Sequence, residues 1–131
     1  MYLFQDQKIT YIYYNNMKTL LWLDDYRNPY NVNEEWLIFS PIKNPNTIWV
    51  KNYNEFINWI LINGLPDAIC FDHDLGEIYS GFDCAKWLVD YCIDNNLKLP
   101  LWNCQSANPV GRENINSLLN NYNKYYGSKN N

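Results

Sequence analysis

Two acidic pairs are the residues of this sequence that could most directly do chemistry. Asp24 and Asp25 follow the apolar run KTLLWL, and Asp72 and Asp74 follow the apolar run DAICF. If these runs are neighbouring strands, the four carboxylates converge and repel one another, and a divalent cation relieves that repulsion. Carboxylate oxygens suit Mg²⁺ or Mn²⁺, so the four residues are candidate metal ligands. The plainer alternative is that they are solvated or helix-capping acids.

A second cluster lies in the run SANPVGR, which contains Ser106, Asn108, Gly111 and Arg112. Asn108 is a typical N-cap, and the proline after it suits the first position of a helix. Free backbone N–H groups and the helix dipole attract anions at such a helix start, and an arginine there can bind two phosphate oxygens at once. We expect Asn108, Gly111 and Arg112 to bind phosphate together with Arg27, which is the other arginine of the chain. Plain helix capping with a surface arginine is the alternative.

His73 is the only histidine, and it lies between Asp72 and Asp74. In that position it could act as an acid or base or donate to phosphate. A structural role is an equal alternative. Tyr30 and Trp36 follow Arg27 and could stack on a nucleotide base, although aromatic residues that cover a core are at least as common.

The elements that must position these residues alternate along the chain. Short apolar runs predict buried parallel strands, and apolar residues three or four positions apart predict helices between them. Alternation of strands and helices predicts a parallel sheet, in which ligands bind beyond the carboxyl ends of the strands. We expect strands at 18–23, 47–51, 67–71 and 99–104, and helices that end near Asn63, run from Gly81 to about Asp94, and start at Pro109.

The remaining segments divide the chain into one domain with two appendages. We expect an N-terminal extension at 1–16, in which 8–14 could be an edge strand, a domain at 17–126 and a frayed tail at 127–131. The segment 29–41 is predicted as a long loop with a short helix near the site.

Composition limits the function. The chain has 131 residues, 47% of them hydrophobic, and a net charge of −4 without a basic run, which disfavours binding to a long nucleic-acid duplex. Four cysteines without a CxxC pair, together with one histidine, disfavour a zinc site and suit buried thiols in a reducing compartment. No signal peptide or membrane-spanning run is visible, so we expect a cytoplasmic protein. Abundant Asn, and eight Lys against two Arg, are typical of an AT-rich genome such as some viruses have.

Four motifs in order, LLWLDDYRNP, LPDAICFDHDLG, GFDCAKWL and SANPVGRENI, resemble the cyclic-phosphate processing receiver-like domain family over residues 17–123. The resemblance implies a three-layer, receiver-like (flavodoxin-like) α/β fold, with a parallel sheet and flanking helices. It implies activity on cyclic phosphates of nucleotides or RNA ends, in RNA repair or conflict systems. It places Asp24 and Asp25 at the metal-binding acidic pair of receivers, Asp72 at the phospho-acceptor and Ser106 at the hydroxyl after the fourth strand.

Two departures from the family pattern affect the expected function. The chain shows no clear fifth strand and no lysine after one, which disfavours phosphorelay signalling. Gln105 stands where relatives often carry histidine, and glutamine cannot transfer a proton. From the acidic residues and the arginines we expect a Mg²⁺-dependent phosphoesterase with Asp72, His73 and Ser106 as catalytic residues, whereas Gln105 supports a protein that only binds its ligand. The alternatives are a non-catalytic module that sequesters a cyclic nucleotide-type signal, and a receiver-like protein-interaction domain.

Overall fold

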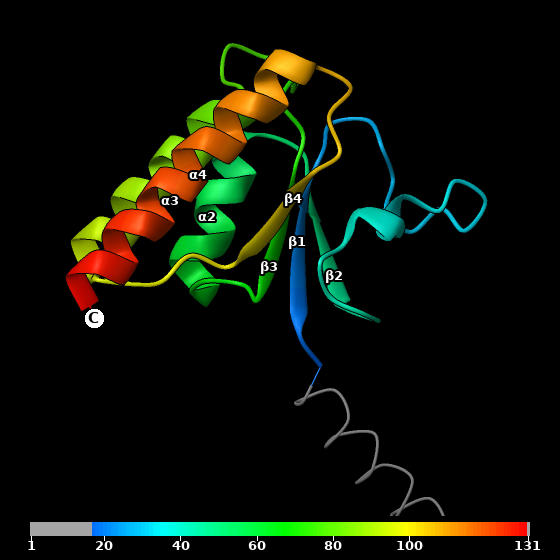
Figure 1. Ribbon diagram of the computed structural model, residues 1–131. Helices are drawn as coiled ribbons and strands as arrows, with labels where there is room; N and C mark the ends of the chain where they lie inside the picture. The colour runs from blue at the N-terminus through cyan, green and yellow to red at the C-terminus, as the bar shows by residue number, and fades with distance from the viewer. Residues whose placement is uncertain (1–16, 131) are drawn as a thin grey trace, which may run out of the picture.

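The computed structural model describes residues 17–130 (Figure 1). Alternating strands and helices follow one another as the apolar runs predict. In chain order they are β1 (Thr19–Leu23), a 3-10 helix η1 (Trp36–Phe39), β2 (Asn46–Val50), α2 (Tyr53–Asn63), β3 (Ala68–Phe71), α3 (Gly81–Asn95), β4 (Leu101–Cys104) and α4 (Pro109–Asn130). The predicted loop with a short helix at 29–41 is confirmed by η1. The predicted extension at 1–16 lies outside the described residues.

The four strands form one parallel sheet in the order β2-β1-β3-β4. β1 pairs with both β2 and β3, so that Leu21 lies beside Ile48 on one side and Ile69 on the other. No fifth strand follows β4 in the described part of the chain. The predicted receiver-like α/β fold with a parallel sheet and flanking helices is confirmed.

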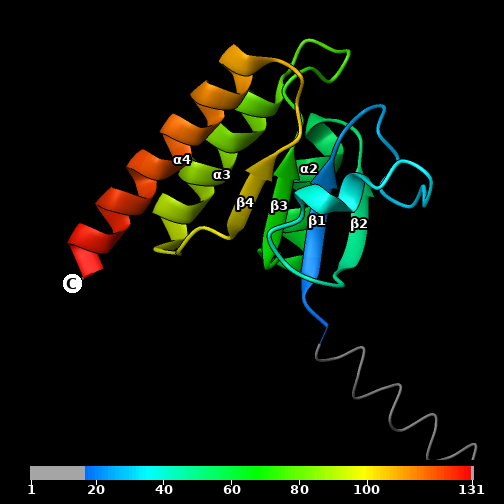
Figure 2. The ribbon, with the colours of Figure 1, turned by 45° about the vertical axis from the view of Figure 1, so that its right-hand side comes forward.

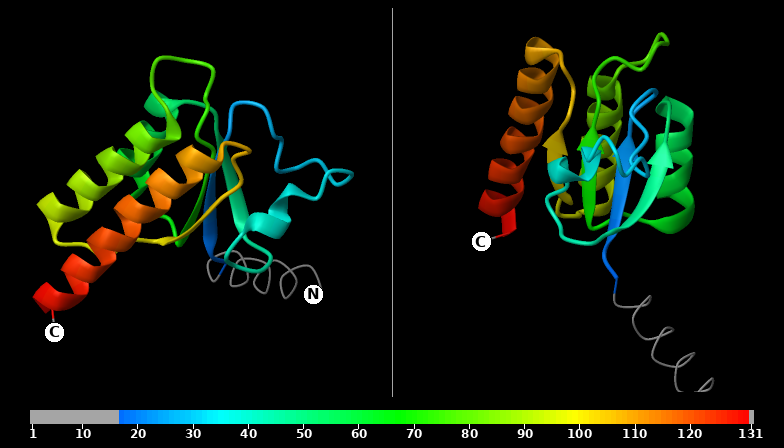
Figure 3. Two further views of the ribbon diagram at one scale, coloured as in Figure 1. Left: turned by 45° about the horizontal axis from the view of Figure 1, so that its top comes forward. Right: turned by 90° about the vertical axis from the view of Figure 1, so that its right-hand side faces the viewer.

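The handedness of the connections decides which face each helix covers. Parallel strands are joined by right-handed crossovers, so a connection that moves one way along the sheet lies on the opposite face from one that moves the other way. The chain moves one way from β1 to β2 and the other way from β2 to β3 and on to β4. Accordingly α2 and α3 cover one face, and the segment with η1 covers the other (Figures 1 and 2). α4 follows the last strand and lies on the same face as α2 and α3. Figure 3 shows the same layers from two further directions.

The strand residues divide between these two layers as period-2 alternation requires. Leu21, Leu23, Ile69 and Phe71 join the main core beneath the three helices. The alternate residues Leu20, Trp22, Ala68 and Cys70 pack under Trp36, Leu37, Phe39 and Ile42 of the η1 segment. All four cysteines are free and buried, as predicted, and burial raises the pKa of Cys70 to about 12. These thiols are therefore poor nucleophiles.

The helices begin and end close to the predicted residues, except at the C-terminus. Ser80 and Asp83 form a capping box at the start of α3. α4 continues to Asn130, so the part of the predicted frayed tail up to that residue is helical. Tyr122 is buried, and its hydroxyl donates to Leu97 O at 2.6 Å, which anchors the last turns of α4 to the body of the domain. None of the helices between residues 17 and 130 has the length and apolarity that crossing a membrane requires.

Candidate functional site

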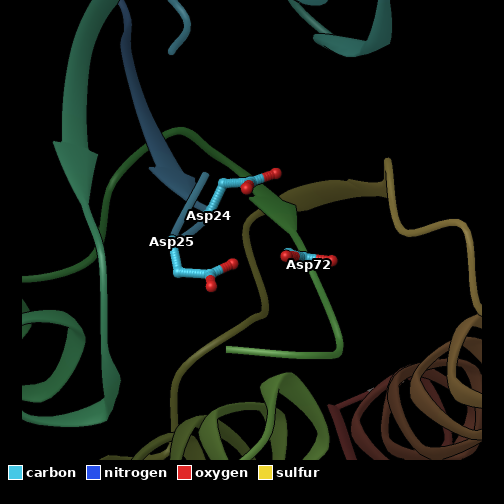
Figure 4. Close-up of side chains that lie close together, drawn as sticks. All are labelled: Asp24, Asp25 and Asp72. Atoms are coloured by element: carbon cyan, nitrogen blue, oxygen red, sulfur yellow. The ribbon is translucent and has the colours of Figure 1, made fainter. Parts of the chain in front are cut away.

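The loops that follow β1, β3 and β4 meet at the carboxyl ends of the strands, at the top of Figure 1. Asp24 and Asp72 are the first residues after the paired strands β1 and β3, and the Asp72 N–H donates to Leu23 O at 2.9 Å. One carboxylate oxygen from each of Asp24, Asp25 and Asp72 lies within 4.8 Å of the other two (Figure 4). We call these three residues the acidic triad. The structure thus brings together three of the four predicted metal ligands.

The acidic triad combines burial with like charge. Asp24 is fully buried and Asp72 is 4% exposed, whereas Asp25 is exposed. Burial, and then the negative charge of Asp24, raise the pKa of Asp72 to about 7, although Arg27 and the His73 N–H oppose the shift. The donors are all carboxylate oxygens, without sulfur or imidazole. That donor chemistry fits Mg²⁺ or Mn²⁺ and disfavours zinc or copper.

The carboxylate of Asp24 accepts four hydrogen bonds. Its Oδ1 accepts from the backbone N–H groups of Tyr26, at 2.9 Å, and Arg27, at 2.8 Å. Its Oδ2 accepts from Arg27 Nη1 at 3.2 Å and Gln105 Nε2 at 3.3 Å. The orientation of this carboxylate is therefore fixed before any ligand arrives.

Arg27 lies between the two buried carboxylates. Its Nη1 is 3.2 Å from Asp24 Oδ2 and 3.6 Å from Asp72 Oδ1, and its guanidinium carbon lies 5.2 Å from the ring centroid of Trp36. Trp36 thus packs on Arg27, while Tyr30 donates its hydroxyl to Thr47 O at 2.9 Å. The structure gives both aromatic residues packing partners, and it gives Arg27 the position of a counter-ion.

Removing the Arg27 side chain should lower the free energy of unfolding of the metal-free protein. Mg²⁺ should offset much of this loss of stability. In Arg27→Ala the carboxylates of Asp24 and Asp72 lose their nearest cation, and breaking a buried ion pair from one side costs about 3 kcal/mol. Urea unfolding in EDTA should show this loss, and unfolding in 10 mM Mg²⁺ should show a smaller one because a bound cation supplies the missing charge. Arg27→Lys is the matched control and should fall between. An equal loss in EDTA and in Mg²⁺ would show that Arg27 does not compensate the acidic triad.

Gln105 serves the site in a way that the sequence did not predict. It follows β4, is 4% exposed, and its Nε2 donates to Leu23 O at 2.9 Å as well as to Asp24 Oδ2. Its Oε1 is buried and has no partner within residues 17–130. The sequence singled out Gln105 only as a departure from the family pattern; its position directly after the strand β4 was the signal for a role at the strand ends.

His73, Asp74, Asn108 and Gly111 form a second group beside the acidic triad. His73 Nδ1 lies 3.1 Å from Asp74 Oδ1 and 3.4 Å from Asn108 Nδ2, and Asn108 Nδ2 lies 3.5 Å from Asp74 Oδ2. The Gly111 N–H donates to Asn108 Oδ1 at 3.0 Å, so Asn108 caps α4 as predicted. Asp74, the fourth predicted metal ligand, therefore turns to His73 and lies outside the acidic triad.

The other predicted residues of the β4–α4 loop hold that loop together. Ser106 is 3% exposed, and its Oγ accepts from the Asn108 N–H at 3.1 Å. Arg112 Nη1 donates to Ser106 O at 2.6 Å. In this state the Ser106 hydroxyl is enclosed, and one end of the Arg112 fork is engaged with the backbone.

Sequence reasoning did not single out Tyr26, which lies between Asp25 and Arg27. Its side chain is 83% exposed beside the acidic triad. An aromatic residue next to the acidic pair was a signal in the sequence. At 83% exposure Tyr26 has more free ring surface than Tyr30, which is 57% exposed, and aromatic faces of this kind can stack on a nucleotide base.

Two of three comparisons with known proteins found matches. The family model described as the cyclic-phosphate processing receiver domain matches residues 19–121. No curated protein matches the sequence. Four chains of solved structures match, and one of them is described as amino acids 181–211 of the yeast Spc42 trimeric coiled coil fused to another structure. It is 16% identical, covers 87% of this chain and 82% of its own, and has a TM-score of 0.52. At that identity the match supports the fold alone.

Proposed function

The chain belongs to the cyclic-phosphate processing receiver domain family, and on that premise we propose that it is a Mg²⁺- or Mn²⁺-dependent phosphoesterase that opens a cyclic phosphate on a nucleotide or an RNA end. The observation that carries the proposal is the acidic triad, because three carboxylates with one oxygen each within 4.8 Å of one another repel, a bound cation relieves that repulsion, and they lie where receiver-like sheets bind ligands.

The residues of the acidic triad would hold the cation. When bound, such an ion polarises a phosphoryl oxygen and lowers the pKa of a coordinated water. The raised pKa of Asp72 supports this assignment, because a buried carboxylate that resists ionisation alone gains most from a cation. Asp72 could instead attack phosphorus as a nucleophile, which the same position would allow.

Arg27 and the start of α4 are suited to bind the phosphate. Within residues 17–130, Arg27 uses only Nη1 of its side chain for hydrogen bonds, so its other N–H groups are available to phosphate oxygens. Arg112 offers its remaining N–H groups at the start of α4 in the same way. Preorganised donors of this kind stabilise the charge that develops on the equatorial oxygens in phosphoryl transfer.

Product analysis tests the proposal. We expect the pure protein with Mg²⁺ to add one water to at least one member of a panel of 2′,3′-cyclic nucleotides, ADP-ribose cyclic phosphate and short RNAs with cyclic ends, read by mass spectrometry. EDTA should stop the reaction and Mn²⁺ should restore it. No mass gain on any substrate with either ion would contradict the proposal.

A non-catalytic binding module is the second candidate, and the enclosed Ser106 hydroxyl and the structural role of Gln105 favour it. Neither group is placed to act on a ligand in this state: Ser106 is 3% exposed and Gln105 is occupied with Asp24. A sequestering protein would retain one cyclic nucleotide during gel filtration and return it unchanged after denaturation. Recovery of the opened product would exclude that function.

A further inference from the structure

We propose that Asp74 is a positioning residue, which holds the His73 imidazole with its proton on Nδ1 so that Nε2 is free to accept a proton from the attacking water. The inference deepens the proposed function and rests on it. It gives Asp74 a role different from the metal-binding role that the sequence predicted.

The contact between His73 and Asp74 favours one tautomer of the imidazole ring. Nδ1 lies 3.1 Å from Asp74 Oδ1. An ionised carboxylate can only accept hydrogen bonds, so this contact is a hydrogen bond only when Nδ1 carries the proton. The neutral ring then has its lone pair on Nε2, the nitrogen needed for a general base.

Asn108 contacts both members of this pair. Its Oδ1 accepts from the Gly111 N–H at 3.0 Å, which fixes the amide with Nδ2 toward His73 and Asp74. Nδ2 can donate to Asp74 Oδ2 at 3.5 Å. Its 3.4 Å contact with His73 Nδ1 would be a hydrogen bond only in the opposite tautomer, because Nδ2 carries donors alone, and it competes with the shorter, charge-assisted contact between Nδ1 and Asp74. Asn108 therefore supports the carboxylate that orients the ring.

Gly111 provides the space that the ring occupies. A Cβ at this position would lie 2.3 Å from His73 Cγ and 2.6 Å from Cδ2, so the imidazole rests directly against the start of α4. Nε2 has no hydrogen-bond partner within residues 17–130, and the His73 side chain is 21% exposed. The His73 N–H donates to Asp72 Oδ1 at 2.9 Å, which ties the group to the acidic triad.

The chemical step balances without a further reactant. Water attacks phosphorus and gives one proton to Nε2, while the bond between phosphorus and one ring oxygen breaks. The leaving oxygen then takes that proton from the imidazolium. The product is a monoester and a free hydroxyl, and His73 returns to its neutral state.

The tautomer is measured directly, because His73 is the only histidine in the chain. Long-range ¹H–¹⁵N correlation on the full-length protein at about pH 9, above the ordinary imidazole range, shows which ring nitrogen carries the proton. We expect Nδ1–H in the wild type and a shift toward Nε2–H in Asp74→Asn. Asp94→Asn, the same change at an exposed site on the far end of α3, should keep the wild-type tautomer. A wild-type ring protonated on Nε2 overturns the proposal.

Kinetics of the same variants test the consequence. We expect Asp74→Asn to lower kcat about 10- to 100-fold with little change in KM, as for other residues that orient a functional group. Asp74→Glu should keep a higher rate than Asp74→Asn, and Asp94→Asn should keep the wild-type rate. A changed tautomer with an unchanged kcat would remove Asp74 from the reaction. If the wild type opens no cyclic phosphate, the proposed function fails, whereas the tautomer result still decides whether Asp74 orients His73.

Discussion

Replacing Asp72 by Asn is expected to lower metal-dependent turnover by about 10³-fold and, at the same time, to stabilise the metal-free protein at pH 8. The amide keeps the shape of the carboxylate but removes the charge that a cation needs, and loss of one preorganised group at such a site costs 10² to 10³ in kcat by order of magnitude. Single-turnover rates with Mg²⁺ give the first effect. Urea unfolding in EDTA gives the second.

The stability gain follows from the raised pKa of Asp72, which is about 7 in the fold and 3.8 in the unfolded reference. Between those values the folded protein binds a proton that the unfolded chain does not, so stability falls as the pH rises from about 4 to about 7. Asn cannot ionise and avoids this loss. Since one pKa unit corresponds to about 1.4 kcal/mol, the advantage of the variant should grow by about 3 kcal/mol between pH 5 and pH 8.

Magnesium should reverse this ranking. The wild type should gain stability as Mg²⁺ is added, and Asp72→Asn should gain little, because binding to the folded state alone is what stabilises it. Asp94→Asn serves as the control for a lost carboxylate and should follow the wild type throughout. The same Mg²⁺ stabilisation in Asp72→Asn as in the wild type would show that Asp72 is not a ligand.

Gly81→Ala is expected to be the most destabilising single-methyl change in the domain. A Cβ at Gly81 would lie 1.7 Å from the carbonyl oxygen of Asp72 and 2.8 Å from its carbonyl carbon. The Gly81 N–H also donates to His73 O at 2.7 Å, so the start of α3 is drawn tightly against the end of β3. Both clashing atoms belong to the backbone, and a rotamer change cannot relieve them. We expect a loss of roughly 4 kcal/mol by urea unfolding.

Gly127→Ala is the matched control. A Cβ there meets nothing within 4 Å, and replacing a glycine inside α4 should stabilise the helix by up to about 1 kcal/mol. Surviving folded Gly81→Ala protein should also bind Mg²⁺ more weakly, because Asp72 must move with its carbonyl. A urea midpoint equal to the wild type for Gly81→Ala would show that the β3–α3 junction has room that the structure does not show.

The sequence predicted the two central strands well because they are short, apolar and followed by acids. Burial on both faces makes runs such as LLWL and AICF continuous, and each is followed at once by the residue that the sheet places at the site. It predicted the carboxylates of Asp24, Asp25 and Asp72 as neighbours for the same reason. The end of α4 was harder to predict, since Tyr122 anchors that helix through a tertiary contact that local sequence does not reveal.

The roles of individual polar side chains could not be derived from strand order. Asp74 follows Asp72 by two residues and looked equivalent to it, but the chain turns after β3 and directs Asp74 toward His73. Arg27 looked like a free phosphate ligand, whereas its Nη1 pairs with Asp24. Both contacts are local, one and three positions apart in the sequence, but they depend on the turns that the chain makes after β3 and β1, and spacing alone does not specify those turns.

Hydrolysis in ¹⁸O-labelled water tests the central claim most directly. The wild-type protein should open a cyclic phosphate with Mg²⁺, and mass spectrometry should find one ¹⁸O on the phosphate of the product. Incorporation of ¹⁸O should stop in EDTA, and its rate should fall by about 10³-fold in Asp72→Asn. A product that forms equally well in EDTA or in the Asp72 variant, or a substrate panel returned without ¹⁸O, would contradict the assignment of the acidic triad as the centre of cyclic-phosphate chemistry.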